Sequence, residues 1–217
     1  MSTGSEVVRE KPLLRGVFHE IAAAFALAGG VALTQMARGA RGTVAAAVYG
    51  VSLTALFGIS ALYHRPHWGP RVYSFMRRLD HAAIFVLIAG TYTPICLLVP
   101  DRTGLVLLAA VWAGAAAGVV FSVLWPRAPK WLNAALYVAL GWAVVPVLPR
   151  LARALGPVGL TLITGGGVVY SIGALIYAMR RPDPFPRVFG YHEVFHLLVI
   201  VAAAFHYAAV ASVVGAL

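Results

Sequence analysis

The stretch GYHEVFHLLVIVAAAFHYAAV, residues 190–210, decides the fold class of this chain. It is apolar enough to cross a lipid bilayer as a helix, which takes about 20 residues. It nevertheless contains four polar side chains, namely His192, Glu193, His196 and His206. A polar group in hydrocarbon costs about 2–4 kcal/mol unless it is partnered, so each of these residues needs a partner inside the protein.

Similar apolar runs recur along the whole chain of 217 residues. Hydrophobic residues make up 61% of the sequence, charged residues make up 11%, and the mean hydropathy is +0.85. A soluble domain of this length needs far more polar surface. We therefore predict an all-α integral membrane protein with seven transmembrane helices, at 16–37, 43–63, 79–99, 103–124, 131–148, 157–179 and 191–216.

These runs define one domain. Residues 1–15 are expected to form a short polar tail and residues 16–217 the seven-helix transmembrane domain. The first apolar run is longer than the roughly 7–15 residues of a signal-peptide core, so we expect it to be retained as a helix. Cys96 is the only cysteine, which excludes a disulfide framework or a cysteine zinc site within the chain.

The formal net charge of +10 raises the question of nucleic-acid binding. The basic residues, however, lie in short breaks between the apolar runs and not on one polar face, so we expect no nucleic-acid partner. Twelve of the 17 Lys and Arg residues fall in the N-terminal tail and the second, fourth and sixth breaks. Because the side richer in positive charge is cytoplasmic, we predict a cytoplasmic N-terminus and an extracytoplasmic C-terminus.

This topology brings several polar residues to one depth, the inner leaflet. Glu20 lies near the start of the first span, His64 at the end of the second, and Asp80 at the start of the third, while His192 and His196 lie in the first two turns of the seventh. Residues at positions i and i+4 project from the same face of a helix, so His192 and His196 are placed to bind one ion.

His64 is the candidate for a third nitrogen ligand. Three neutral imidazoles with an open fourth position are typical of catalytic zinc, and Asp80 then fits as a base or orienting group beside a bound water. Other interpretations stay open at this point: a buried His is often a hydrogen-bond partner between helices, and Asp80 could pair with a neighbouring Arg. His206 is 14 residues beyond His192, about 21 Å along a helix, so it cannot share that ion.

Four short motifs give the chain a family resemblance. SALYH (60–64), LDHAAIFVLIAGTYTP (79–94) and GYHEVFHL (190–197), together with RGVFHE (15–20), resemble the haemolysin III-like proteins and the progestin and adipoQ receptors, bacterial branch. The likeness covers all seven spans in order. It implies a seven-helix bundle with its N-terminus inside and a multi-pass protein of the bacterial cell (inner) membrane.

The resemblance also implies a site. It places zinc on His64, His192 and His196, with Asp80 near the metal water and Ser60 one turn from His64. The wider superfamily is viewed as metal-dependent membrane hydrolases, and its adiponectin-receptor-like members as acting on lipid amides such as ceramides.

From these observations we expect a zinc-dependent intramembrane hydrolase that acts on a lipid amide or ester at the inner leaflet. Asp80 and Ser60 would be its catalytic residues, and membrane lipids its partners. The alternative is a non-enzymatic sensor, receptor or haemolysin-like permeability protein with a structural zinc. A third interpretation is an ion or proton path, which the confinement of the polar set to one leaflet disfavours. An open fourth position on the zinc would favour the enzyme.

Overall fold

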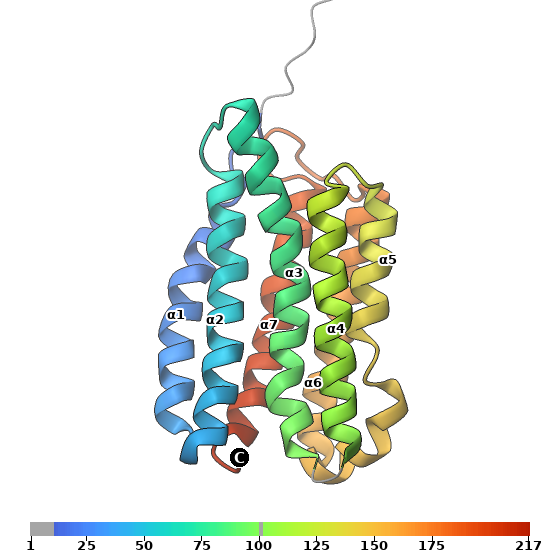
Figure 1. Ribbon diagram of the computed structural model, residues 1–217. Coiled ribbons are helices and arrows are strands. Elements are labelled where there is room, and N and C mark those ends of the chain that lie inside the picture. Colours follow the sequence, from blue (N-terminus) through green and yellow to red (C-terminus); the bar gives the residue numbers. More distant parts are fainter. Residues whose placement is uncertain (1–10, 100–101) are drawn as a thin grey trace, which may run out of the picture.

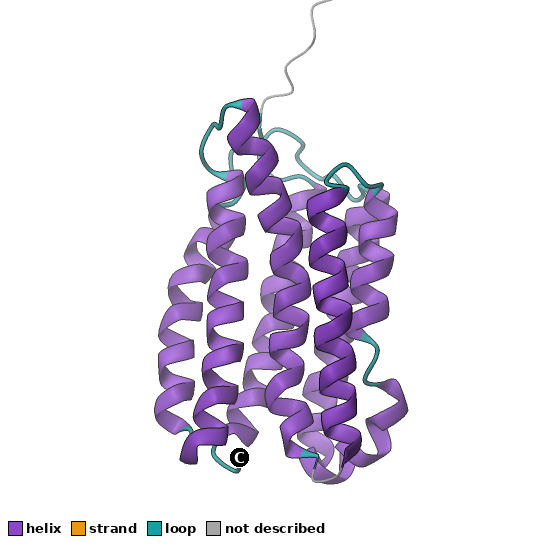
Figure 2. Cartoon of the chain, in the orientation of Figure 1, coloured by secondary structure: helices purple, strands orange, loops and turns teal. Residues whose placement is uncertain are grey.

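The chain forms a bundle of long helices whose axes are roughly aligned (Figure 1). The computed structural model describes residues 11–99 and 102–217, and within these ranges it contains seven α-helices and no β-strand (Figure 2). The helices are α1 (Val17–Met36), α2 (Gly39–His64), α3 (Pro70–Leu98), α4 (Arg102–Leu124), α5 (Lys130–Gly141), α6 (Leu148–Met179) and α7 (Tyr191–Val214), with a short 3₁₀ helix η1 (Val145–Val147) between α5 and α6.

Six segments of the described residues are long and apolar enough to cross a membrane, because α5, η1 and α6 together count as one segment, Lys130–Met179. Large apolar side chains cover the outside of the bundle: Phe25 is 75% exposed and Leu124 is 77% exposed. A soluble protein rarely exposes so much apolar surface, whereas lipid accommodates it. The predicted class, an all-helical membrane protein, is therefore confirmed.

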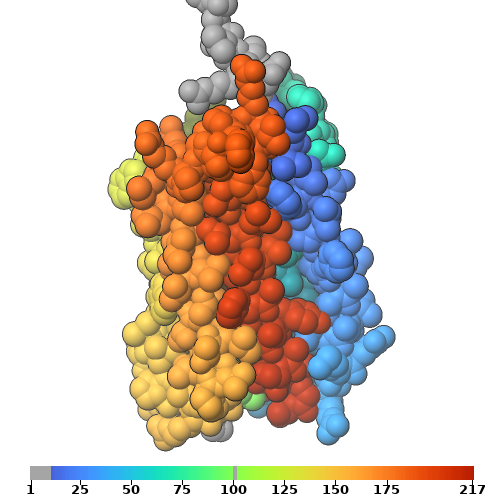
Figure 3. All heavy atoms as spheres, turned by 180° about the vertical axis from the view of Figure 1, so that it is seen from behind, coloured from blue at the N-terminus to red at the C-terminus, as the bar shows by residue number. Residues whose placement is uncertain are grey.

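Helix α7 is the element that joins the two sides of the bundle. It packs against α1, α2, α3 and α6, and in the view from behind it lies between α1 and α6 (Figure 3). The loops at residues 65–69, 125–129 and 180–190 lie together at one end of the bundle (Figure 1). The end of α2, the first half of α3 and the start of α7 consequently meet near that end.

Three predicted boundaries are wrong. Helix α3 begins at Pro70 and not at residue 79, since proline suits the first helical turn and hydropathy reports only the apolar part of a helix. Helix α5 ends at Gly141, short of the predicted residue 148. The predicted break at 149–156 is mostly helical, and only Gly156, at φ 68° and ψ 179°, leaves the helical conformation. This conformation is essentially restricted to glycine, and the following proline disfavours the helical region at Gly156.

The irregular backbone between α5 and α6 is stabilised by a side chain from another helix. The hydroxyl of Tyr92, on α3, donates to the carbonyl of Gly141 at 2.7 Å and accepts a hydrogen bond from the backbone N–H of Val144 at 2.8 Å. Non-helical backbone is tolerated within a membrane protein only where such groups find partners inside the protein. Tyr92 supplies that partner on both sides of the break.

Candidate metal centre

Three buried histidines meet where α2 and α7 come together. His64 is the last residue of α2, and His192 and His196 lie in the first two turns of α7. One ligand nitrogen of each lies within 4.8 Å of those of the other two, and the Nε2 atoms of His64 and His192 are 3.1 Å apart. The structure thus brings together the three histidines that the sequence singled out.

The arrangement fits a zinc ion. Two nitrogens bound to one tetrahedral zinc, each at about 2.0–2.1 Å, lie about 3.3 Å apart, close to the separation of the His64 and His192 nitrogens. The Nδ1 atom of His196 is buried and has no hydrogen-bond partner among the described residues. Buried polar atoms are normally partnered, so nitrogens left in this state are candidates for a missing ligand. Three neutral imidazoles are a donor set that zinc accepts readily.

A fourth histidine, which sequence reasoning left without a role, packs against this cluster. The ring of His19, on α1, stacks on that of His196 with centroids 3.8 Å apart and planes 11° apart. An imidazole binds metal in the plane of its ring, so two parallel rings at this distance cannot both point at one ion. Both nitrogens of His19 are buried without a partner among the described residues. His19 is therefore placed to fix the orientation of the His196 ring.

Glu193 lies between two of the histidines but is occupied elsewhere. One carboxylate oxygen accepts the backbone N–H of Gly190 at 2.8 Å, at the start of α7. The other forms an ion pair with Arg15, which precedes α1. Glu193 is fully buried, and this pairing satisfies its charge. This pair links the start of α7, which carries His192 and His196, to the segment that precedes α1.

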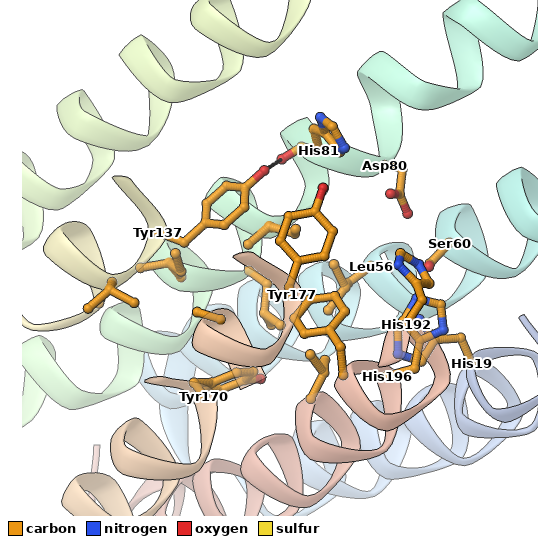
Figure 4. Close-up of a pocket in the computed structure, with 18 of the residues that line it drawn as sticks. His19, Leu56, Ser60, Asp80, His81, Tyr137, Tyr170, Tyr177, His192 and His196 are labelled. Carbon is orange, nitrogen blue, oxygen red and sulfur yellow. Dashed lines mark hydrogen bonds between the residues drawn. The ribbon is translucent and has the colours of Figure 1, made fainter. Parts of the chain in front are cut away.

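Asp80 and Ser60 lie beside the histidines, as the sequence predicts (Figure 4). Ser60 is on α2, one turn before His64, and Asp80 is on α3. Both residues line the same cavity as the three histidines. The carboxylate is therefore available to a molecule in that cavity.

The cavity has a volume of about 360 Å³ and runs from the histidines into the middle of the bundle. Its deeper walls are mainly apolar, with contributions from Leu56, Ile84, Leu87, Ile88, Val138 and Val199. His206 lines its far part, and its Nε2 atom lies 3.1 Å from the carbonyl oxygen of Ile163. His206 thus has its own partner and lies apart from the cluster, as its spacing along α7 requires.

Glu20, which the topology had placed at the same depth, does not join the site. Its carboxylate pairs with Arg65 at 2.8 Å, and its side chain is 56% exposed. This pairing could not be predicted from the sequence, because Glu20 and Arg65 belong to separate segments that come into contact only in the folded bundle. His67 is also exposed, whereas His81 is buried and lines the cavity.

The fold and the site define a helical membrane protein with a buried histidine cluster opening on an amphipathic cavity. The sequence matches the family described as haemolysin-III related over residues 7–207. It is 35% identical to Hemolysin-3 of Bacillus cereus over 166 residues, covering 76% of this chain and 73% of the relative. It is 32% identical to the Hemolysin-3 homolog of Bacillus subtilis over 159 residues, covering 72% and 71%.

A mammalian relative matches more distantly. The chain is 27% identical over 179 residues to the human monocyte to macrophage differentiation factor, covering 77% of this chain and 69% of the relative. The chain belongs to the haemolysin III family, and the resemblance read from its motifs is confirmed.

Proposed function

We propose that this protein is a zinc-dependent intramembrane hydrolase of a lipid amide or ester, acting at the inner leaflet of the bacterial cell membrane. The observation that carries the proposal is the placement of three convergent buried imidazoles and one carboxylate at the end of a mainly apolar cavity. His64, His192 and His196 would hold the metal. Such a cavity suits a molecule with an apolar chain and a reactive polar group.

The residues around the cluster have distinct proposed roles. When bound, zinc would polarise the scissile carbonyl and lower the pKa of a water molecule toward about 7. The Asp80 carboxylate would accept the proton of the attacking water and pass it to the leaving nitrogen or oxygen. The Ser60 hydroxyl, which lines the same cavity, would donate a hydrogen bond to that carboxylate and orient it. The apolar walls would bind the acyl chain and exclude bulk water.

A second candidate function comes from the relatives. Two Bacillus relatives carry the name Hemolysin-3, which favours a non-enzymatic permeability or sensor protein in which the metal is structural. The two candidates differ in the fourth coordination position, which a protein side chain would fill in a structural site and leave open in a catalytic one. Asp80 also distinguishes them, since only the hydrolase requires its carboxylate to be ionisable.

The hydrolase proposal is tested on the purified full chain in detergent or bilayers, with zinc content measured by elemental analysis. We expect Asp80→Asn to keep its zinc and to lower hydrolysis of lipid amides or esters about 100-fold or more, the usual effect of a lost general base. His64→Ala should lose both zinc and activity.

Two results would count against this proposal. If Asp80→Asn hydrolyses substrate as fast as the parent protein, Asp80 is not the base. If the zinc-loaded parent hydrolyses no member of a panel of lipid amides and esters faster than His64→Ala does, the non-enzymatic candidate replaces the hydrolase.

A further inference from the structure

The wall of the cavity is unevenly charged. Four cationic side chains line it, Lys11, Arg15, Arg77 and Lys130, whereas Asp80 is the one carboxylate among its lining residues in the described part of the chain. Lys130 is the first residue of α5, and Lys11 and Arg15 precede α1. These cations therefore gather toward the end of the bundle where the loops lie, and the apolar walls extend away from them.

Among the described residues, one of these four cations forms an ion pair with a carboxylate. Arg15 is neutralised by Glu193. Lys11 donates to the backbone carbonyl of Pro66 at 2.8 Å, and burial together with the nearby charge of Arg15 lowers its pKa. Among the described residues, neither Arg77 nor Lys130 forms an ion pair with a carboxylate within 4.0 Å, although Arg77 interacts electrostatically with Asp80, three residues further along α3. Positive charge that faces a cavity without a counterion attracts an anionic ligand.

Lys130 is held in place by two aromatic rings. Its ammonium group lies 4.7 Å from the centroid of the Tyr177 ring and 4.8 Å from that of Tyr191, and it donates to the Tyr191 hydroxyl at 2.6 Å. These contacts fix the ammonium group without neutralising it. A lysine that served only to set the membrane topology needs no such arrangement and would extend into water.

The size of the cavity limits the apolar part of a ligand. Pockets that enclose small organic ligands measure about 300–1,000 Å³, and this cavity, at about 360 Å³, lies near the lower limit. One acyl chain fits such a volume better than the two chains of a membrane phospholipid. A ligand with a single acyl chain and an anionic polar end matches both the volume of the cavity and the positive charge that lines it.

We infer that the substrate is a single-chain acyl amide or ester whose polar end carries a carboxylate or phosphate, bound by Arg77 and Lys130. This inference rests on the proposed hydrolase function. For an N-acyl amino acid, the water oxygen would form a new C–O bond to the acyl carbon as the C–N bond breaks. The leaving nitrogen would take a proton, so the products would be a fatty acid and a free amino acid.

The test measures binding separately from hydrolysis. Displacement of a fluorescent acyl probe from Asp80→Asn protein would compare N-acylglycine with N-acylglycinamide of the same chain length, which differ only in the terminal charge. We expect the anion to bind at least about tenfold more tightly, equivalent to about 1.4 kcal/mol. A monoalkyl phosphate compared with the matching alkanol would show whether phosphate is accepted as well as carboxylate.

Two variants should remove this preference, and two should retain it. Arg77→Gln and Lys130→Gln should each erase most of the difference between the charged and neutral ligands. Arg78→Gln and Arg127→Gln are matched controls, since Arg78 donates to the carbonyl of Val123 and Arg127 is exposed, and neither lines the cavity. Raised salt concentration should also weaken binding of the anion more than binding of the amide.

The outcomes separate this inference from the proposed function. Equal binding of the two ligands, or equal effects of the Arg77 and Arg78 substitutions, would overturn the inference while leaving the hydrolase intact. Charge-dependent binding without hydrolysis of either ligand by the zinc-loaded parent would retain the anion site but overturn the substrate assignment, and the hydrolase itself would be removed only if no member of the panel of lipid amides and esters were hydrolysed. Faster hydrolysis of N-acylglycine than of its amide, lost in Arg77→Gln, would support both.

Discussion

The histidines of this protein differ in the groups that their imidazole rings contact. Those of His64, His192 and His196 face one another, whereas His206 meets a backbone carbonyl and His19 stacks on a neighbouring ring. The i, i+4 spacing in α7 and the shared depth of His64 indicated the cluster, and the family resemblance implied its three members. The stack of His19 was not predictable, because it depends on how α1 packs against α7. The same holds for the pairing of Arg15 with Glu193.

The metal content should follow this division. We expect His192→Ala and His196→Ala to abolish binding of about one zinc per chain, because each removes one of three proposed ligands. His206→Ala is the control on the same helix and should keep its zinc, since His206 lies about 21 Å further along α7. Elemental analysis of the purified variants measures this, and equal loss of metal from all three would contradict the assignment.

His19 should act through His196. We expect His19→Ala to weaken zinc binding about 10–100-fold, the range found when a group that orients a metal ligand is removed. His19→Phe should retain most of the affinity, since a phenyl ring can preserve the stack on His196. Competition with a chelator of known zinc affinity measures the difference. If the Phe and Ala variants bind zinc equally weakly, the nitrogen atoms of His19 matter and its stacking does not.

At the level of the helices, hydropathy located the apolar runs but did not predict the residues at which α3 begins and α5 ends. The seven-residue difference between the predicted end of α5, residue 148, and its observed end, Gly141, reflects contacts between residues that lie far apart in the sequence. Pro146 lies within the predicted span 131–148 and disfavours a continuous helix there. The helix ends earlier, at Gly141, where the Tyr92 hydroxyl of α3 provides a donor and an acceptor. The first turns of α3 were missed because they are polar, although Pro70 is suited to begin a helix.

Tyr92→Phe tests whether this contact stabilises the break. The change removes one hydroxyl and leaves the carbonyl of Gly141 and the N–H of Val144 without that partner, which should cost about 1–3 kcal/mol. Tyr207→Phe is a matched control, because the Tyr207 hydroxyl makes a single hydrogen bond, to the carbonyl of Gly29. Thermal unfolding in detergent should show a larger fall in Tm for Tyr92→Phe. Equal falls would mean that the break does not depend on Tyr92.

For the whole molecule, the composition was sufficient to predict a helical membrane protein, and the motifs were sufficient to predict its family. The number of membrane crossings does not follow from the number of apolar segments. Six segments are long and apolar enough to cross a membrane, but one of them, Lys130–Met179, contains the two helices α5 and α6. In Figure 1, α5 starts and α6 finishes at the same end of the bundle. A chain that enters and returns in this way would add one crossing to the six segments.

We therefore predict seven crossings, with the N-terminus in the cytoplasm and the C-terminus outside it. The reason is the asymmetry of Lys and Arg, twelve of which lie on the predicted cytoplasmic side and five on the other. A reporter fused after Leu217 should be active only outside the cytoplasm, and the same reporter before Met1 only inside. A further fusion in the break near Gly156 should report the outside if α5 and α6 each cross. Both terminal reporters on one side would establish an even number of crossings, and an N-terminal reporter active only outside would remove the inner-leaflet placement of the histidine cluster, because the cluster lies at the end of the bundle where α1 begins.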